Sequence, residues 1–244
     1  MTTAKVSSGR MTVLEDADAL AEAVAAWLLG RAVASDRFVI SLSGGSTPKR
    51  LYERLASPDY VQRFPWAKTH LFWGDERFVP ADHPESNYRM TKLALLDKAS
   101  IPEGNIHRIM TDSGTPEAAA EAYDRHLRQF YGAERLDPAR PLFDVTLLGL
   151  GPDGHTASLL PGEPVLDERK IWVAPVSHGR PEVRITLTYP PIESSAAIAF
   201  LVAGADKAKM LAHVRSGADD VPAGRLASAG EGWWFADRAA ASDA

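Results

Sequence analysis

The chain contains 244 residues, of which 45% are hydrophobic and 24% charged, with 18 glycines, 17 prolines and no cysteine. This length fits one large α/β or all-β domain or two small ones, and the ordinary glycine and proline content excludes collagen-like and low-complexity proteins. The formal net charge of −5 argues against a broad basic face for nucleic acid or an anionic membrane, and the lack of cysteine excludes thiol nucleophiles, disulfides and thiolate metal sites.

Apolar periodicity predicts helices and strands that alternate along most of the chain. In chain order, the predicted elements are a helix at 16–31, a strand at 38–42, a helix from Thr47 and Pro48 onward, a strand at 70–73, helices at 86–96 and 115–132, strands at 144–148, 171–173, 183–187 and 197–202, and a helix at 207–214. Thr47 and Ser86 are the expected N-caps of their helices, and Gly132 is the expected end of another.

This alternation is typical of a mainly parallel sheet that is covered by helices on both faces. The predicted fold is therefore a three-layer α/β/α arrangement with a doubly wound, Rossmann-like sheet. No linker, charge run or internal repeat divides the chain, so we expect residues 1–244 to form a single domain. In such sheets ligands bind beyond the carboxyl ends of the strands, and three polar, glycine-bearing segments of this chain fall there.

The first of these segments, 41–49, contains Gly44, Gly45, Ser46 and Thr47. Adjacent glycines permit a sharp turn and a close approach of the backbone to a ligand, while amides and hydroxyls at a helix start suit a phosphate or carboxylate. The spacing is that of neither a P-loop nor a dinucleotide-binding turn. An ordinary strand-to-helix turn with a Ser/Thr cap is the structural alternative.

The second segment, 72–80, places Asp75, Glu76 and Arg77 directly after an apolar strand. An arginine at this edge of the sheet can clamp an anion or stabilise a developing oxyanion. The alternative is a solvated loop with an internal Asp–Arg pair.

The third segment, 147–159, carries Asp153 and His155 on a glycine-flanked loop. A carboxylate next to an imidazole can orient it as a general base near neutral pH. The alternative is that His155 only caps a helix beginning near Thr156.

Two isolated cations follow, Arg184 inside an apolar strand and Lys207 at a helix start. Taken singly, each is explained as well by a solvent-facing strand edge or by a routine helix lysine. The remaining histidines considered show no metal-ligand spacing, so no metal site is predicted; they are His70, His107, His126, His178 and His213.

Taken together, these segments resemble the 6-phosphogluconolactonase family within the glucosamine-6-phosphate deaminase/isomerase-like superfamily. The matching pieces occur in the family's order over nearly the whole chain: LSGGSTPK at 42–49, WGDER at 73–77, SNY at 86–88, LGLGPDGHTASLLPG at 148–162, RITLT at 184–188, GADKA at 204–208 and a WFAD stretch near the end.

The resemblance implies hydrolysis of 6-phospho-D-glucono-1,5-lactone to 6-phospho-D-gluconate, the second step of the oxidative pentose phosphate pathway, without a cofactor. It also implies roles for the candidate residues. Gly44, Gly45, Ser46 and Thr47 would cradle the substrate, Arg184 and Lys207 would hold its phosphate, Arg77 would contact the sugar-acid part, and His155 with Asp153 would serve the chemistry. No G-x-S-x-G elbow is present, which favours water over serine as the nucleophile.

Two other functions remain open on the sequence. An amino-sugar-phosphate deaminase or isomerase would share the fold and the D-G-H loop, but those deaminases typically carry D-E-Y where this chain has Asp75, Glu76 and Arg77. A non-catalytic sugar-phosphate sensor would have no need of the pair Asp153 and His155.

Segment 1–10 lacks the apolar core of a signal peptide, and no apolar run approaches about 18 residues. We therefore expect a cytoplasmic protein that binds a small sugar phosphate and neither nucleic acid nor a membrane. We also expect it to be a monomer or a weak homodimer.

Overall fold

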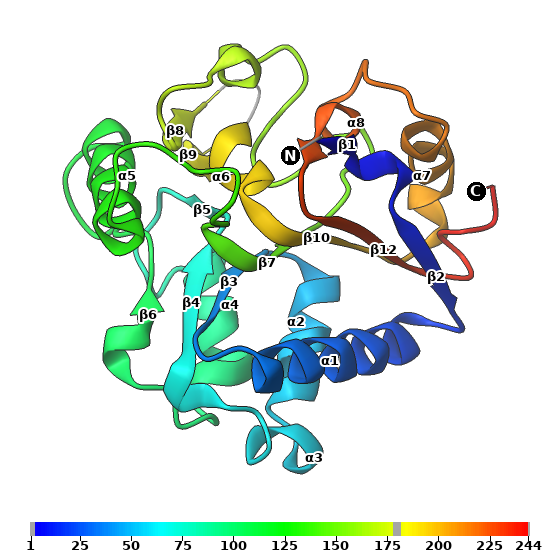
Figure 1. The fold of residues 1–244 in the computed structure, drawn as a ribbon, viewed down its shortest axis with the longest axis horizontal. Coiled ribbons are helices and arrows are strands. Elements are labelled where there is room, and N and C mark those ends of the chain that lie inside the picture. The colour runs from blue at the N-terminus through cyan, green and yellow to red at the C-terminus, as the bar shows by residue number, and fades with distance from the viewer. Residues whose placement is uncertain (1–2, 178–181, 244) are drawn as a thin grey trace.

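The computed structural model describes residues 3–177 and 182–243 (Figure 1). Its strands are β1 Ala4–Lys5, β2 Arg10–Leu14, β3 Phe38–Leu42, β4 Thr69–Trp73, β5 Asp75–Arg77, β6 Ile106–His107, β7 Phe143–Leu148, β8 Val173–Val176, β9 Arg184–Leu187, β10 Ser195–Val202, β11 Ala227–Ser228 and β12 Glu231–Asp237. Its α-helices are α1 Ala17–Ala34, α2 Ser46–Leu55, α3 Pro58–Val61, α4 Asn87–Thr91, α5 Pro116–Tyr131, α6 Tyr189–Glu193, α7 Ala208–Arg215 and α8 Pro222–Arg225. Within the described residues, every helix is too short or too polar to span a bilayer.

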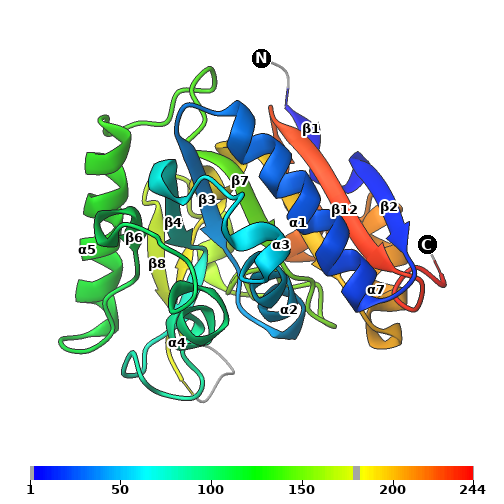
Figure 2. The ribbon, with the colours of Figure 1, turned by 90° about the horizontal axis from the view of Figure 1, so that it is seen from below.

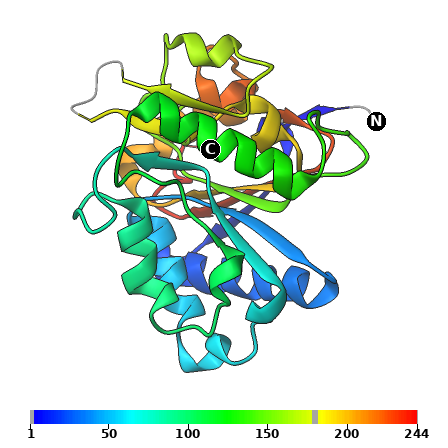
Figure 3. The same cartoon turned by 90° about the vertical axis from the view of Figure 1, so that its left-hand side faces the viewer.

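The central sheet has seven strands in the order β2-β12-β10-β7-β3-β4-β6, and its neighbouring strands pair in parallel. Helices α1, α2 and α3 cover one face, while α5, α6 and α7 lie on the other (Figures 1 and 3). Strand β2, from the start of the chain, lies beside β12, from its end (Figure 2). The predicted three-layer α/β/α fold with a mainly parallel sheet is therefore confirmed.

The strand order reverses between β3 and β7. From β3 the chain proceeds to β4 and β6 on one side, and it then returns to β7 on the other. In an open parallel sheet, the crevice beyond the carboxyl ends of two such strands is the usual ligand site. The loops that leave Leu42 and Leu148, the last residues of β3 and β7, therefore emerge at this crevice.

A second, smaller sheet is antiparallel and has the order β5-β9-β8. It contains two of the strands that the apolar pattern predicted, and neither of them joins the central sheet. The prediction of a strand at 171–173 is wrong in position, because β8 begins only at Val173 and Ile171 is 43% exposed. The segment Asp75–Arg77, for which a solvated loop was the structural alternative, is strand β5, because it pairs with β9.

The helix ends follow the predicted capping signals with one exception. Ser86 Oγ accepts a hydrogen bond from the amide of Arg89 at 3.1 Å, and Gly132 ends α5 with a left-handed φ of 78°. The exception is Thr47, which lies inside the first turn of α2. That helix begins one residue earlier, after Gly45, whose φ of 105° is one that glycine adopts without strain.

The apolar core fills the space between the sheet and its helices. Every residue of β3 is buried, as expected for a central parallel strand. Helix α1 buries Leu20, Val24 and Leu28 at the predicted helical spacing. Each such side chain contributes roughly 1.5–3 kcal/mol when fully buried. The carboxyl edge of the sheet is thereby held on a rigid base.

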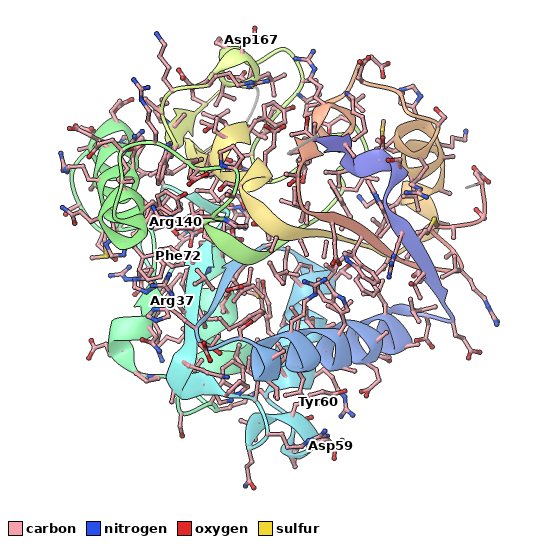
Figure 4. The ribbon with its side chains drawn as sticks, viewed as in Figure 1. Arg37, Asp59, Tyr60, Phe72, Arg140 and Asp167 are labelled. Carbon is pink, nitrogen blue, oxygen red and sulfur yellow. The ribbon has the colours of Figure 1, made fainter. Side chains whose placement is uncertain are left out.

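Three histidines that are distant in sequence form a hydrogen-bonded row beside β4. His70 Nδ1 lies 3.0 Å from His107 Nε2, and His107 Nδ1 lies 2.8 Å from His126 Nε2. Phe72 stacks on His107 with ring centroids 4.2 Å apart, and Arg37 lies near the same group of rings (Figure 4). Among the described residues no group of three or more His, Cys, Asp or Glu side chains could hold a metal ion. His178 lies outside the described residues.

This row makes the stability of the fold sensitive to acid. Burial lowers the pKa of His107 to about 4, with a further contribution from His126 and His70. The unfolded chain, in which this pKa is near 6.5, therefore binds more protons than the folded chain between about pH 6.5 and 4. Lowering the pH from 7 to 5 should reduce the free energy of unfolding in urea by about 1–2 kcal/mol through His107.

In the His107→Gln variant this part of the pH dependence should disappear. His213→Gln is the matched control, because His213 lies at the exposed end of α7, outside the row, and it should keep the wild-type difference between pH 7 and 5. An unchanged pH dependence in His107→Gln would show that the row does not carry the effect.

Candidate active site

The three polar segments meet at a cavity of about 250 Å³ beyond the carboxyl ends of β3 and β7. The predicted site residues that line it are Gly44, Gly45, Ser46, Thr47, Arg77, His155, Arg184 and Lys207. Asp153 does not line the cavity, but its carboxylate is hydrogen bonded to the ring of His155. The three segments therefore converge beyond the carboxyl ends of the strands, where the sequence analysis placed them.

The first segment forms a rigid turn above the start of α2. Tyr52, which is buried in α2, fixes it from below: its hydroxyl donates to the carbonyl of Ser43 at 2.7 Å and accepts from the amide of Ser43 at 3.0 Å. The amides of Ser46 and Thr47 lie in the first helical turn, where no intrahelical acceptor exists. This end of the cavity therefore offers backbone donors to an anion.

The second segment is not a solvated loop, because Asp75 is only 6% exposed. Its carboxylate accepts a hydrogen bond from Ser158 Oγ at 2.6 Å. The guanidinium of Arg77 is held by its Nη1 group, which donates to the carbonyl of Glu85 at 2.8 Å and to Asn87 Oδ1 at 2.9 Å. Both side chains therefore have fixed positions at the cavity wall.

Glu76 lies behind this wall and is 2% exposed. Its carboxylate accepts from Ser86 Oγ at 3.1 Å and from the backbone amides of Arg77, Asn87 and Tyr88 at 2.7–2.8 Å. Burial raises the pKa of Glu76, although these donors oppose the effect. Glu76 therefore organises the backbone around Arg77 and does not face the cavity.

The third segment holds its imidazole by close packing. An added Cβ on Gly151 would lie 2.0 Å from His155 Nδ1, so only glycine leaves room for the ring. The helix considered near Thr156 is absent; the chain forms a turn closed by a hydrogen bond from the amide of Leu159 to the carbonyl of Thr156. His155 is therefore not a helix cap.

Asp153 and His155 of this segment are in direct contact. Asp153 Oδ1 is hydrogen bonded to His155 Nδ1 and also accepts from the amide of His155 at 3.2 Å. Burial of the carboxylate opposes its ionisation, but its hydrogen bonds and the charge of His155 outweigh burial and lower the pKa of Asp153. An ionised Asp153 fixes the proton of the neutral ring on Nδ1 and leaves Nε2 as the basic nitrogen.

The two isolated cations both reach the cavity. Arg184 faces Arg77 across the ladder of β5 and β9, and its side chain is 13% exposed. It is therefore not at a solvent-facing strand edge. Like charges placed opposite each other on a sheet are unfavourable, and Glu182, 2.9 Å from Arg184 Nη2, offsets the charge only in part. Lys207 Nζ lies 3.1 Å from Asp206 Oδ2. Arg77, Arg184 and Lys207 together form the cationic wall of the cavity.

Several residues of this site were not predicted. Asn87 and Ser158 are buried polar side chains. Asn87 contacts Arg77 of the preceding strand, and Ser158 contacts Asp75, which is 83 residues away in the sequence. Glu182 lies two residues before Arg184, and that spacing was the one signal that could have indicated the pair.

An imidazole oriented by a carboxylate, a cationic wall and free amides at one crevice define an α/β enzyme site for a small anionic molecule. The family model of glucosamine-6-phosphate isomerases/6-phosphogluconolactonase matches residues 15–234. The chain therefore belongs to this family.

Known proteins agree with this assignment. The chain is 44% identical to a 6-phosphogluconolactonase of Nostoc over 212 residues, 85% of each chain. It is 46% identical to one of Synechocystis over 206 residues, 82% of each chain. The crystal structure of 6-phosphogluconolactonase from Thermotoga maritima superimposes with a TM-score of 0.79 at 31% identity, covering 93% of this chain and 98% of that one. The predicted family, and the prediction that the chain is an enzyme of this type, are confirmed.

Proposed function

We propose that this chain hydrolyses 6-phospho-D-glucono-1,5-lactone to 6-phospho-D-gluconate in the oxidative pentose phosphate pathway, with His155 as the general base. The observation that carries the proposal is the oriented pair Asp153–His155 at the same cavity as Arg77, Arg184 and Lys207. The relatives named above support the substrate, and the geometry supports the chemistry.

In the first step, His155 Nε2 takes a proton from water as the water oxygen bonds to the lactone carbonyl carbon. The carbonyl oxygen becomes an oxyanion, which Arg77 or backbone amides of the cavity stabilise. In the second step, the carbon–ring-oxygen bond breaks, and protonated His155 returns its proton to that oxygen. The product is an open-chain acid, which ionises to the carboxylate. Hydrolysis transfers no electrons and no group other than water, so it requires no organic cofactor.

The phosphate of the substrate is held by Arg184 and Lys207, assisted by the amides of Ser46 and Thr47. These groups supply the charge and the donors that a phosphate dianion needs. Gly44 and Gly45 keep the backbone of that turn free of side chains, so the substrate approaches it closely. The remaining cation, Arg77, faces the sugar-acid part. The expectations of a cytoplasmic location and of a monomer or weak homodimer stay predictions.

The direct test measures proton release from freshly prepared lactone, above the rate of its spontaneous hydrolysis. Purified chain should accelerate this release in proportion to its concentration. Ammonia release from glucosamine 6-phosphate is the second arm, and clear release there would assign the chain to the deaminases. Tight binding of 6-phosphogluconate without lactone hydrolysis would instead indicate a sensor.

Lys207→Ala should mainly raise KM, by roughly 10-fold or more, because a hydrogen bond to a charged group is worth about 1.5–3 kcal/mol. Lys209→Ala is the matched control: Lys209 is an exposed lysine of α7 that does not line the cavity. Steady-state kinetics of both variants decide the point. An unchanged KM in Lys207→Ala would remove its contact with the phosphate.

A further inference from the structure

A buried asparagine joins the first two segments of the site. Asn87 is 2% exposed. Its Nδ2 donates to the backbone carbonyl of Asp75 at 2.9 Å, and its Oδ1 accepts from Arg77 Nη1 at 2.9 Å. Gly44 packs against the same side-chain amide, since an added Cβ there would lie 2.0 Å from Asn87 Oδ1. The amide of Asn87 therefore fills the space between the turn at Gly44 and strand β5.

Asn87 is itself held by the buried carboxylate of Glu76. The backbone amide of Asn87 donates to Glu76 Oε1 at 2.7 Å, and the backbone amide of Tyr88 donates to Glu76 Oε2 at 2.7 Å. Ser86 adds a third contact through its hydroxyl. Because a buried carboxylate is costly unless it is hydrogen bonded, these donors bind the start of α4 to β5. The position of the Asn87 side chain follows from this attachment.

The guanidinium of Arg77 needs such support. Arg184 is its direct cross-strand neighbour, and repulsion between the two cations would otherwise drive them apart. The contacts of Nη1 with the carbonyl of Glu85 and with Asn87 Oδ1 occupy one edge of the guanidinium. Within the described part of the chain, the buried Nε of Arg77 has no acceptor. Arg77 also lines the cavity, so the part of its guanidinium that Glu85 and Asn87 do not engage is available to a ligand there.

We propose that Asn87 is a positioning residue, which holds the Arg77 guanidinium at the cavity wall and is itself kept in place by Glu76. The proposal rests on the proposed function only in that the ligand of Arg77 is the lactone or its product. A neutral amide is required, because it must accept from Arg77 and donate to the carbonyl of Asp75 at the same time. A carboxylate at this position would turn an acceptor toward that carbonyl and add a charge 3.4 Å from the Asp75 side chain.

The test is a double-mutant cycle of Asn87→Ala and Arg77→Ala. Both kinetic constants for the lactone and the Kd of 6-phosphogluconate by calorimetry are measured for each variant. Asn87→Ala should lower kcat/KM by roughly 10- to 100-fold, as expected for misplacement of a catalytic group by about 1 Å. Asn87→Ala should change the same kinetic parameter as Arg77→Ala. In the double variant it should add little to the loss that Arg77→Ala causes alone. Fully additive losses would overturn the proposal.

The isosteric variant Asn87→Asp separates positioning from simple packing. It fills the same volume, so a space-filling role predicts kinetic constants near those of the wild type, and that result would also overturn the proposal. We expect it to lose activity like Asn87→Ala. If urea unfolding shows that Asn87→Ala does not fold, Asn87→Ser replaces it in the cycle. An inactive wild type would refute the proposed function alone, because the Kd of 6-phosphogluconate still completes the cycle.

Discussion

Replacing His155 by alanine is expected to lower kcat for the lactone at least ~100-fold, because general-base catalysis contributes roughly two to four powers of ten. The geometry behind this expectation is specific. Nδ1 of the ring is engaged by Asp153, so Nε2 is the nitrogen left to accept a proton from water. The binding groups of the cavity come from other residues, and KM should therefore change much less than kcat.

The measurement follows initial proton release at several enzyme concentrations, with the spontaneous rate subtracted. Calorimetric binding of 6-phosphogluconate serves as the control for an intact cavity, and it should remain close to that of the wild type. The kcat of Asp153→Asn should lie between those of the wild type and His155→Ala, because the side-chain amide still contacts the ring but no longer fixes its tautomer by charge. Turnover near the wild-type rate in His155→Ala would remove His155 from the mechanism.

Local sequence signals predicted the central strands of the main sheet, β3, β4, β7 and β10, but not β2, β6 and β12. The apolar run 38–42 became the buried strand β3, and the capping signals at Ser86 and Gly132 were confirmed. What could not be predicted depended on pairing between distant segments. The three residues of β5 carry only charged side chains, and they form a strand because β9 supplies hydrogen-bonding partners more than 100 residues later.

The residues of the candidate site also divide into those that a local sequence signal indicates and those that it does not. Residues that follow a strand and face the ligand crevice, such as His155 and Arg77, could be found because parallel strands end at one edge. Arg184 needed the structure or a family resemblance, since a single cation in an apolar strand has no distinctive local pattern. Glu76 and Asn87 lie in the quoted WGDER and SNY pieces, but their part in the site was not predicted, because it is a set of buried hydrogen bonds between β5 and α4.

Gly151→Ala is the second substitution for which we expect a large effect, although it removes no functional group. The new methyl carbon would lie 2.0 Å from Nδ1 of His155 and 2.2 Å from its Cε1, a separation that no pair of such atoms tolerates. The ring must therefore move away. Because displacement of a catalytic group by about 1 Å can cost roughly 100-fold in rate, kcat should fall by about 10- to 100-fold.

A double-mutant cycle shows whether this loss acts through the imidazole. In the His155→Ala background the methyl group no longer meets a ring, so Gly151→Ala should cause little further loss of kcat. A loss of equal size in both backgrounds would mean that the methyl group disturbs the loop or the substrate and not His155.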